Sequence, residues 1–140
     1  MNNTCHCRIG SNESFTFTES KRIVDYKGNM KVDASIGSDM NRIPAQARKL
    51  EEMGYSGLRI AELNHDPFMP LAVAASATDS IELITSVAVA FSRNPMSMAI
   101  LAHDLNAFSK GRFILGLGSQ VKPHIERRFS MPWHKAAAQM

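Results

Sequence analysis

The chain has 140 residues, of which 44% are hydrophobic and 21% charged, and its formal charge is +3 at pH 7. This composition is typical of a single globular domain that can bury a core of useful size. The charge excess is small and no run of five or more like charges occurs, so the sequence argues against nucleic-acid binding. No stretch approaches the ~20 apolar residues of a membrane span, so we expect no membrane contact.

The N-terminal region is polar and predicts a disordered leader over residues 1–29, followed by one domain over residues 30–140. Cys5 and Cys7 are separated only by His6, whereas paired thiolate ligands of a metal usually lie at least two residues apart. We therefore expect two incidental thiols and no metal site. The cysteine usage and the absence of a signal-peptide core favour a cytoplasmic protein.

The regular part of the sequence begins with a strand and a helix. Lys31–Ile36 alternates between apolar and polar residues and predicts a short strand. Pro44–Met53 predicts a helix, because proline stands in its first turn and Gly54 follows its end. Three apolar residues share one face of this helix at helical spacing: Ile43, Ala47 and Leu50.

A second strand and helix follow. Gly57–Leu63 predicts the strand, and Pro67–Thr78 predicts an alanine-rich helix that can lie close to a sheet. Asp66 precedes the proline as an N-cap precedes the first residue of a helix. The strand and the helix are thus joined by a short polar loop.

The third strand is predicted over Ile81–Phe91, whose nearly continuous apolar run suits a parallel strand buried on both faces. Asn94 and Pro95 repeat the signal of a cap followed by proline, and the helix they begin extends to about Ser109. Gly111 closes it. The residues expected to face inward are Met98, Leu101, Ala102, Leu105 and Phe108.

The fourth strand is predicted over Arg112–Leu117. Gly116 and Gly118 at its end suggest a dinucleotide-binding loop, but that fingerprint needs a small residue where Val121 stands. The segment beyond contains Pro123 and does not predict a clean helix. We therefore expect the two glycines to allow close approach of a ligand or of a neighbouring backbone.

Four strands alternate with three helices in units of about 25–30 residues, which predicts an α/β fold with a parallel sheet. Periodicity alone leaves open an open doubly wound sheet and part of a TIM-type (β/α)8 barrel. A complete barrel needs ~250 residues, so the chain would supply about the N-terminal half. The strand order decides, because a barrel follows chain order and a doubly wound sheet reverses it.

Several segments resemble one known family. Leu83–Val87 resembles the Leu-Gly-Thr-Ser/Gly-Val pattern of luciferase-like monooxygenases, and Gly111–Gly118 resembles their Gly-Arg-x-x-Leu-Gly-Leu-Gly strand. Glu62–Asp66 falls where that family carries acidic and histidine residues. Gly118–Phe129 is most similar to the subgroup that depends on the deazaflavin coenzyme F420. The resemblance covers residues 31 to about 134.

The resemblance implies a barrel whose site lies at the C-terminal ends of the strands and binds either FMN or coenzyme F420. It implies an oxidoreductase that transfers a hydride or electrons between this ring and a small-molecule substrate. By the same resemblance, His65 is the expected catalytic residue. The residues expected to bind the cofactor are Asp66, Ser86, Val87, Gly118, Ser119 and Gln120.

The same residues also have structural interpretations. His65 can hydrogen-bond the loop backbone, and Asp66 can act only as an N-cap. Ser86 and Val87 match the family position of a non-proline cis peptide, but they can equally lie in an ordinary buried strand. Some deazaflavin enzymes carry a glutamate at one of the two positions where this chain has Gln120 and Val121, so a mechanism that needs this acid is not expected.

Two other functions remain open at this point: a small doubly wound module that binds a nucleotide or an anion, and a non-catalytic half-barrel remnant. A half-barrel alone would leave two unpaired strand edges and an exposed apolar inner face. We therefore expect self-association or a complementing barrel half, and we expect the activity to be incomplete in a chain of this length.

Overall fold

The computed structural model describes residues 6–7 and 30–133. Its main feature is a five-stranded sheet in the order β1-β2-β3-β4-β6, beside a two-stranded sheet of β5 and β7. The strands are β1 (His6–Cys7), β2 (Val32–Ser35), β3 (Gly57–Ile60), β4 (Glu82–Thr85), β5 (Ala88–Val89), β6 (Phe113–Ile114) and β7 (Leu117–Gly118). The helices are α1 (Ile43–Glu52), α2 (Phe68–Ala77), a short 3-10 turn (Ala90–Ser92), α3 (Pro95–Phe108) and α4 (Lys122–Arg128).

The strands from β2 to β6 are parallel and follow chain order, with one helix between successive members. This order is that of a barrel, so the fold prediction is confirmed and the doubly wound alternative is wrong. One row of paired residues crosses the sheet from Ala34 through Leu58 and Leu83 to Phe113, and all four belong to the core. Register therefore places these core residues of β2, β3, β4 and β6 on one face.

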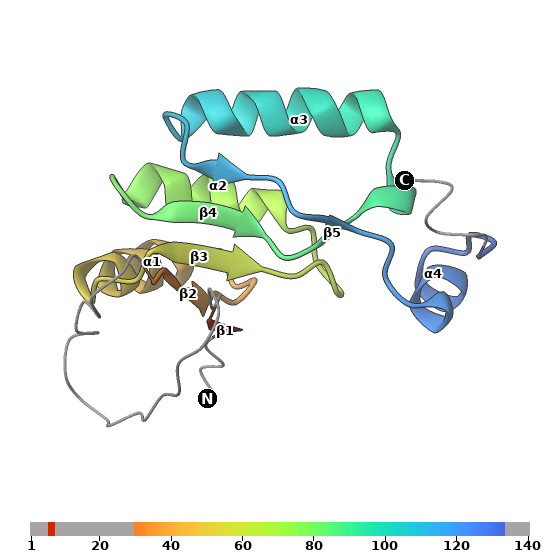
Figure 1. Ribbon diagram of the computed structural model, residues 1–140, viewed down its shortest axis with the longest axis horizontal. Helices are drawn as coiled ribbons and strands as arrows, with labels where there is room; N and C mark the ends of the chain where they lie inside the picture. The colour runs from red at the N-terminus through yellow and green to blue at the C-terminus, as the bar shows by residue number, and fades with distance from the viewer. Residues whose placement is uncertain (1–5, 8–29, 134–140) are drawn as a thin grey trace.

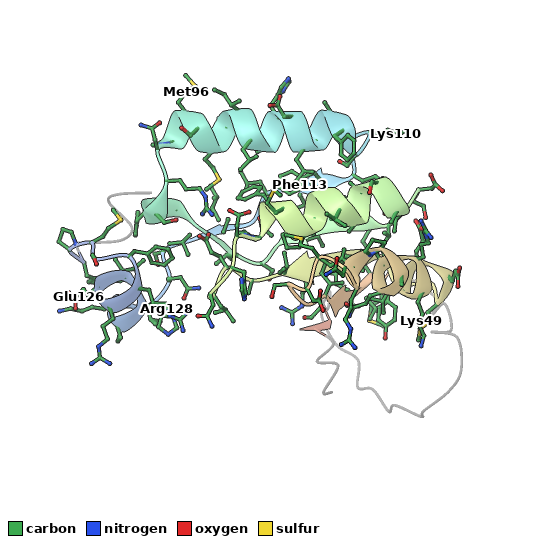
Figure 2. All side chains as sticks on the ribbon, turned by 180° about the vertical axis from the view of Figure 1, so that it is seen from behind. Lys49, Met96, Lys110, Phe113, Glu126 and Arg128 are labelled. Atoms are coloured by element: carbon green, nitrogen blue, oxygen red, sulfur yellow. The ribbon has the colours of Figure 1, made fainter. Side chains whose placement is uncertain are left out.

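The helices cover that apolar face. Figure 1 shows α1 and α2 behind β3 and β4, with α3 running beside α2 and β6. The predicted face of α1 is confirmed, because Ile43, Ala47 and Leu50 are all buried. Seen from behind in Figure 2, Lys49 and Lys110 lie at one end of the molecule, and α4 lies at the other. The parallel strands β2, β3, β4 and β6 point towards the α4 end, so their carboxyl ends form a rim there.

Two strand predictions were too long. The predicted strand Ile81–Phe91 is divided, because β4 ends at Thr85 and the chain then joins a second sheet as β5. The predicted strand Arg112–Leu117 is divided in the same way into β6 and β7. The hydroxyl of Thr85 fills the gap between the two ladders, donating to the Gly116 carbonyl at 3.0 Å and accepting from its N–H at 2.8 Å. The apolar run continues across this break, so periodicity could not reveal it.

The inward face of α3 was predicted only in part. Met98 and Leu105 are buried and Ala102 is partly buried, but Leu101 is 37% exposed and Phe108 is 59% exposed. The helix is apolar on most of its circumference, whereas α2 and β6 contact only one side of it. A single contact surface cannot cover residues that lie to the side of the buried stripe.

The edge and the inner face of the sheet also differ from expectation. The pair His6–Cys7 forms an antiparallel ladder with β2, so β2 is not an unpaired edge strand. The rest of the predicted leader lies outside the described residues. The face of the sheet away from the helices carries the partly buried polar residues Asp33, Ser35 and Arg59. Ser35 pairs with Arg59, and Arg59 pairs in turn with Ile84, so an apolar residue continues this row on β4. The predicted apolar inner face is therefore wrong for β2 and β3.

The segment after β7 was expected not to form a clean helix, and this expectation was wrong. Residues Lys122–Arg128 form α4, with Pro123 in the first turn, where a missing N–H costs nothing. Ile125 is buried and anchors this short helix. In the described part of the chain, no helix combines the length and the hydrophobicity that crossing a membrane requires.

Candidate functional site

The carboxyl ends of the strands are joined by hydrogen bonds that continue beyond the regular ladders. The Ser86 N–H donates to the Ile60 carbonyl at 2.8 Å, and the Glu62 N–H donates to the Val87 carbonyl at 3.1 Å. The side-chain amide of Gln120 donates to the Glu62 carbonyl at 3.4 Å. Segments that follow β3, β4 and β7 therefore meet around Glu62 at the rim seen in Figure 1.

A cluster of three charged residues holds this rim, and we call Glu62, Arg93 and Asp66 the rim ion cluster. The Arg93 guanidinium lies 2.6 Å from Glu62 Oε2 and 2.7 Å from Asp66 Oδ2. The Glu62 side chain is 7% exposed and that of Arg93 20% exposed, so this is a largely buried pair. Glu62 Oε2 also accepts the Val89 N–H at 2.7 Å. The carboxylate thus has both a cation and a backbone donor.

The electrostatics of the cluster keep Arg93 charged. Burial lowers the pKa of Arg93, but the hydrogen bonds and the charges of Glu62 and Asp66 outweigh burial and raise the pKa above its ordinary value. The guanidinium also lies 5.4 Å from the centre of the Phe68 ring, within cation–π range. With two carboxylates on one guanidinium, the cluster as a whole carries a negative charge.

Asp66 acts as the cap of α2, as the sequence predicted. Its Oδ1 accepts the N–H groups of Phe68 at 2.8 Å and of Met69 at 3.1 Å, while its Oδ2 binds Arg93. The helix begins at Phe68, one residue later than predicted, because Pro67 precedes the regular hydrogen bonding. Asp66 therefore has a structural role and an electrostatic one at the same time.

His65 lies on the exposed part of the loop between β3 and α2, immediately before Asp66. Ser86 and Val87 are partly buried after β4, and the peptide bond between them is cis, as the resemblance led us to expect. All three residues follow the carboxyl ends of neighbouring parallel strands. The structure therefore brings the predicted catalytic residue and the cis peptide to the same rim.

The other predicted cofactor-binding residues follow β6. Gly118 ends β7, and Ser119 and Gln120 come directly after it, all partly buried. The Gln120 side chain is engaged twice, since its Oε1 lies 3.4 Å from His124 Nδ1 and its amide donates to the Glu62 carbonyl. Gln120 thus links α4 to the rim, and its backbone has a φ of 57°.

The two glycines serve close packing within the protein. A Cβ atom on Gly116 would lie 2.1 Å from the backbone carbonyl oxygen of Thr85. A Cβ atom on Gly118 would lie 2.6 Å from Cγ2 of Val87. Of the two interpretations that the sequence left open, the structure thus supports the approach of a neighbouring segment at both positions.

Sequence reasoning missed Glu62 and Arg93 as members of the site. Both follow apolar strand segments, and a lone charge in such a place is a signal that could have been used. Their pairing could not have been found, because the two residues are 31 positions apart and lie in separate loops. The described residues contain no group of three or more His, Cys, Asp or Glu side chains that could hold a metal ion.

The comparison with protein families identifies the chain. The family model described as luciferase-like monooxygenase matches residues 15–140. The chain belongs to this family. Relatives in Mycobacterium tuberculosis and Mycobacterium bovis, both described as uncharacterised proteins, are 51% identical to it over 111 residues. The match covers 79% of this chain but 33% of theirs, so the chain spans about a third of the length of these relatives.

Solved structures of luciferase-like proteins share the fold. The monooxygenase RslO1 of Streptomyces bottropensis matches with a TM-score of 0.65 and 22% identity over 71% of this chain and 33% of its own. The coenzyme F420 dependent tetrahydromethanopterin reductase of Methanopyrus kandleri matches with a TM-score of 0.64 and 22% identity, and the match covers 72% of this chain and 29% of the reductase. The oxygenating constituent of the 3,6-diketocamphane monooxygenase of Pseudomonas putida, in complex with FMN, matches with a TM-score of 0.60 and 19% identity. This match covers 66% of this chain and 27% of that protein. The described sheet therefore has the fold of part of a luciferase-like barrel.

Proposed function

We propose that this chain carries the part of an oxidoreductase site that faces the ring of a bound flavin or deazaflavin. The observation that carries the proposal is the meeting of three strand ends at Glu62, with His65 exposed on the same rim. In α/β barrels this rim is where active sites are built. Membership of the luciferase-like family supports the choice of an oxidoreductase.

The residues at the rim fit an uncharged ring better than a phosphate. The guanidinium of Arg93 is already bound by two carboxylates, whose two negative charges exceed its single positive charge, so the cluster does not attract an anion. The helix α4 at this end of the molecule carries three exposed cations, Lys122, Arg127 and Arg128. We therefore propose that the ring of the cofactor binds at the rim and that its phosphate-bearing tail is bound elsewhere.

The chemistry that a bound flavin or deazaflavin supplies is hydride exchange with a small organic substrate. The part of His65 would be to hold or release the accompanying proton at a ring nitrogen, for which imidazole is suited near neutral pH. Ser86, Val87 and Gly118 would contribute backbone surface against one side of the ring. Flavin and deazaflavin remain equal candidates, because structural relatives of both kinds share the fold.

The test is direct titration of the 140-residue chain with FMN and with coenzyme F420, following the fluorescence of each ring. We expect the chain to bind one of them, and His65→Ala to weaken that binding about fivefold, as the loss of about 1 kcal/mol from one hydrogen bond would do. His103→Ala is the matched control, because His103 is also exposed but lies on the outer helix α3.

Two results would contradict the proposal. One is that the folded chain binds neither ring at concentrations well above those of weak specific complexes. The other is that the two histidine variants weaken binding equally, which would separate His65 from the binding surface.

A further inference from the structure

Glu62 holds the segment Val87–Val89 through both its backbone and its side chain. Its N–H donates to the Val87 carbonyl at 3.1 Å, and its Oε2 accepts the Val89 N–H at 2.7 Å. Both oxygens of the same carboxylate lie within 2.7 Å of Nη1 of Arg93. The guanidinium of Arg93 is thus connected to the backbone that follows β4 through a single group, the Glu62 carboxylate.

The second arm of Arg93 reaches the other end of the same loop. Its Nη2 lies 2.7 Å from Asp66 Oδ2, while Asp66 Oδ1 caps α2. Glu62 and Asp66 are four residues apart, and the residues between them, Leu63 to His65, are exposed. One side chain from outside the loop therefore fixes both of its ends and leaves its middle facing solvent.

The residue type matters for this arrangement. The guanidinium is a planar fork that can bind two carboxylates at once, whereas the ammonium of lysine is a compact point charge. Burying an ion pair is by itself a weak source of stability, because desolvation opposes the attraction. The arrangement is better explained as one that fixes geometry.

We propose that Arg93 is a positioning residue, which holds the loop carrying His65 against the Val87–Val89 segment so that both can face one ligand. This inference rests on the proposed function, because the ligand is the ring assigned there. Arg93 itself need not touch that ring.

Asp66→Asn is the sharpest test, because asparagine is as good an N-cap as aspartate but cannot form the ion pair with Arg93. Arg93→Gln removes both arms, and Arg93→Lys keeps the charge without the fork. Arg42→Gln is the matched control, since Arg42 forms an exposed ion pair with Asp39 at 3.8 Å, a pair that includes neither Glu62 nor Asp66. Each variant is measured in three ways: urea unfolding, affinity for FMN and F420, and hydrogen exchange of the Val89 amide by NMR.

We expect Asp66→Asn to unfold close to the wild-type urea concentration and yet to weaken ring binding about tenfold. Arg93→Gln should weaken binding at least as much and should speed exchange at Val89 about tenfold, because Glu62 loses its cation. Arg93→Lys should give values between those of Arg93→Gln and the wild type. Arg42→Gln should change none of these quantities.

The inference is overturned if Asp66→Asn and Arg93→Gln bind the ring as the wild type does, even if they unfold more easily. If the wild type binds neither ring, the proposed function fails. In that case exchange at Val89 still separates the two ideas: faster exchange in Arg93→Gln supports the ordering of the rim by Arg93, and unchanged exchange contradicts it.

Discussion

Arg112 offers the most quantitative test of how this fold is held together. Its side chain makes five hydrogen bonds to described residues, all at the end of the sheet opposite the rim. Its Nη2 donates to the carbonyls of Ala75 and Thr78 at 3.2 and 3.0 Å, and its Nη1 donates to the Ile81 carbonyl at 2.9 Å. The side chain therefore ties the last turn of α2 to the start of β4.

Replacing Arg112 with methionine keeps an unbranched apolar stem but removes every donor. Three backbone carbonyls of the α2–β4 turn then lose a partner, at about 1 kcal/mol each, so the expected loss is about 3 kcal/mol. For a domain of this size, that loss lowers the melting temperature by roughly 10–20 °C. Arg112→Lys can satisfy some of these carbonyls and should give an intermediate value.

Urea unfolding followed by circular dichroism measures the loss. The control is Arg48→Met, because exposed Arg48 makes a single hydrogen bond to the described residues, of 3.3 Å, to the Ala77 carbonyl of the same turn. We expect the control to change the free energy of unfolding by about 0.5 kcal/mol or less. If the Arg112 and Arg48 variants lost equal stability, the turn would not depend on Arg112, and this reasoning would be refuted.

Two further predictions concern other parts of the fold. Burial raises the pKa of Glu51, but hydrogen bonds from the turn between α2 and β4 outweigh it and lower the pKa below its ordinary value of 4.5. The ionised carboxylate of Glu51 therefore stabilises the fold above its ordinary pKa, and this stabilisation is lost as pH falls through the lowered pKa. The difference in urea midpoint between the wild type and Glu51→Gln should then become smaller from about pH 7 to about pH 3. A difference that stays constant with pH would contradict this prediction. Gly116→Ala should lower the free energy of unfolding by about 3 kcal/mol, because the new methyl group meets the backbone of Thr85. Gly118→Ala should lower it by about 1 kcal/mol, because the methyl group meets the side chain of Val87, which can move. Thermal melting compares the two, and the reverse order would refute the packing argument.

The helices could be predicted from the sequence to within about one residue at most ends. Pro44–Met53 was expected and Ile43–Glu52 is observed for α1, and α3 begins at Pro95 after its Asn94 cap, as predicted. The signals that mark helix ends are local: a cap side chain bonds the N–H groups two or three residues later, and glycine takes the left-handed conformation after the last turn. Gly111 does so with a φ of 83°.

The ends of the strands could not be predicted, because a strand ends where its neighbours stop pairing with it. The apolar run from Ile81 to Phe91 shows no change at Thr85, yet there the chain leaves β6 and joins β7. The exposure of Phe108 on α3 has the same origin. Which side of an apolar helix is covered depends on what packs against it, and this is decided by the rest of the fold.

For the candidate site, the sequence by itself determined that polar residues follow each apolar strand, and that parallel strands carry them to a common edge. His65, Asp66 and Ser86 were named as site residues from the resemblance to luciferase-like monooxygenases, and the parallel strands bring them to that edge. Only the tertiary structure decided that Arg93 binds Glu62 and Asp66, because ion pairs between separate loops leave no periodic trace in the sequence. The alternation of strands and helices fixes the layers of the fold, whereas contacts between loops depend on distances that exist only after the chain has folded.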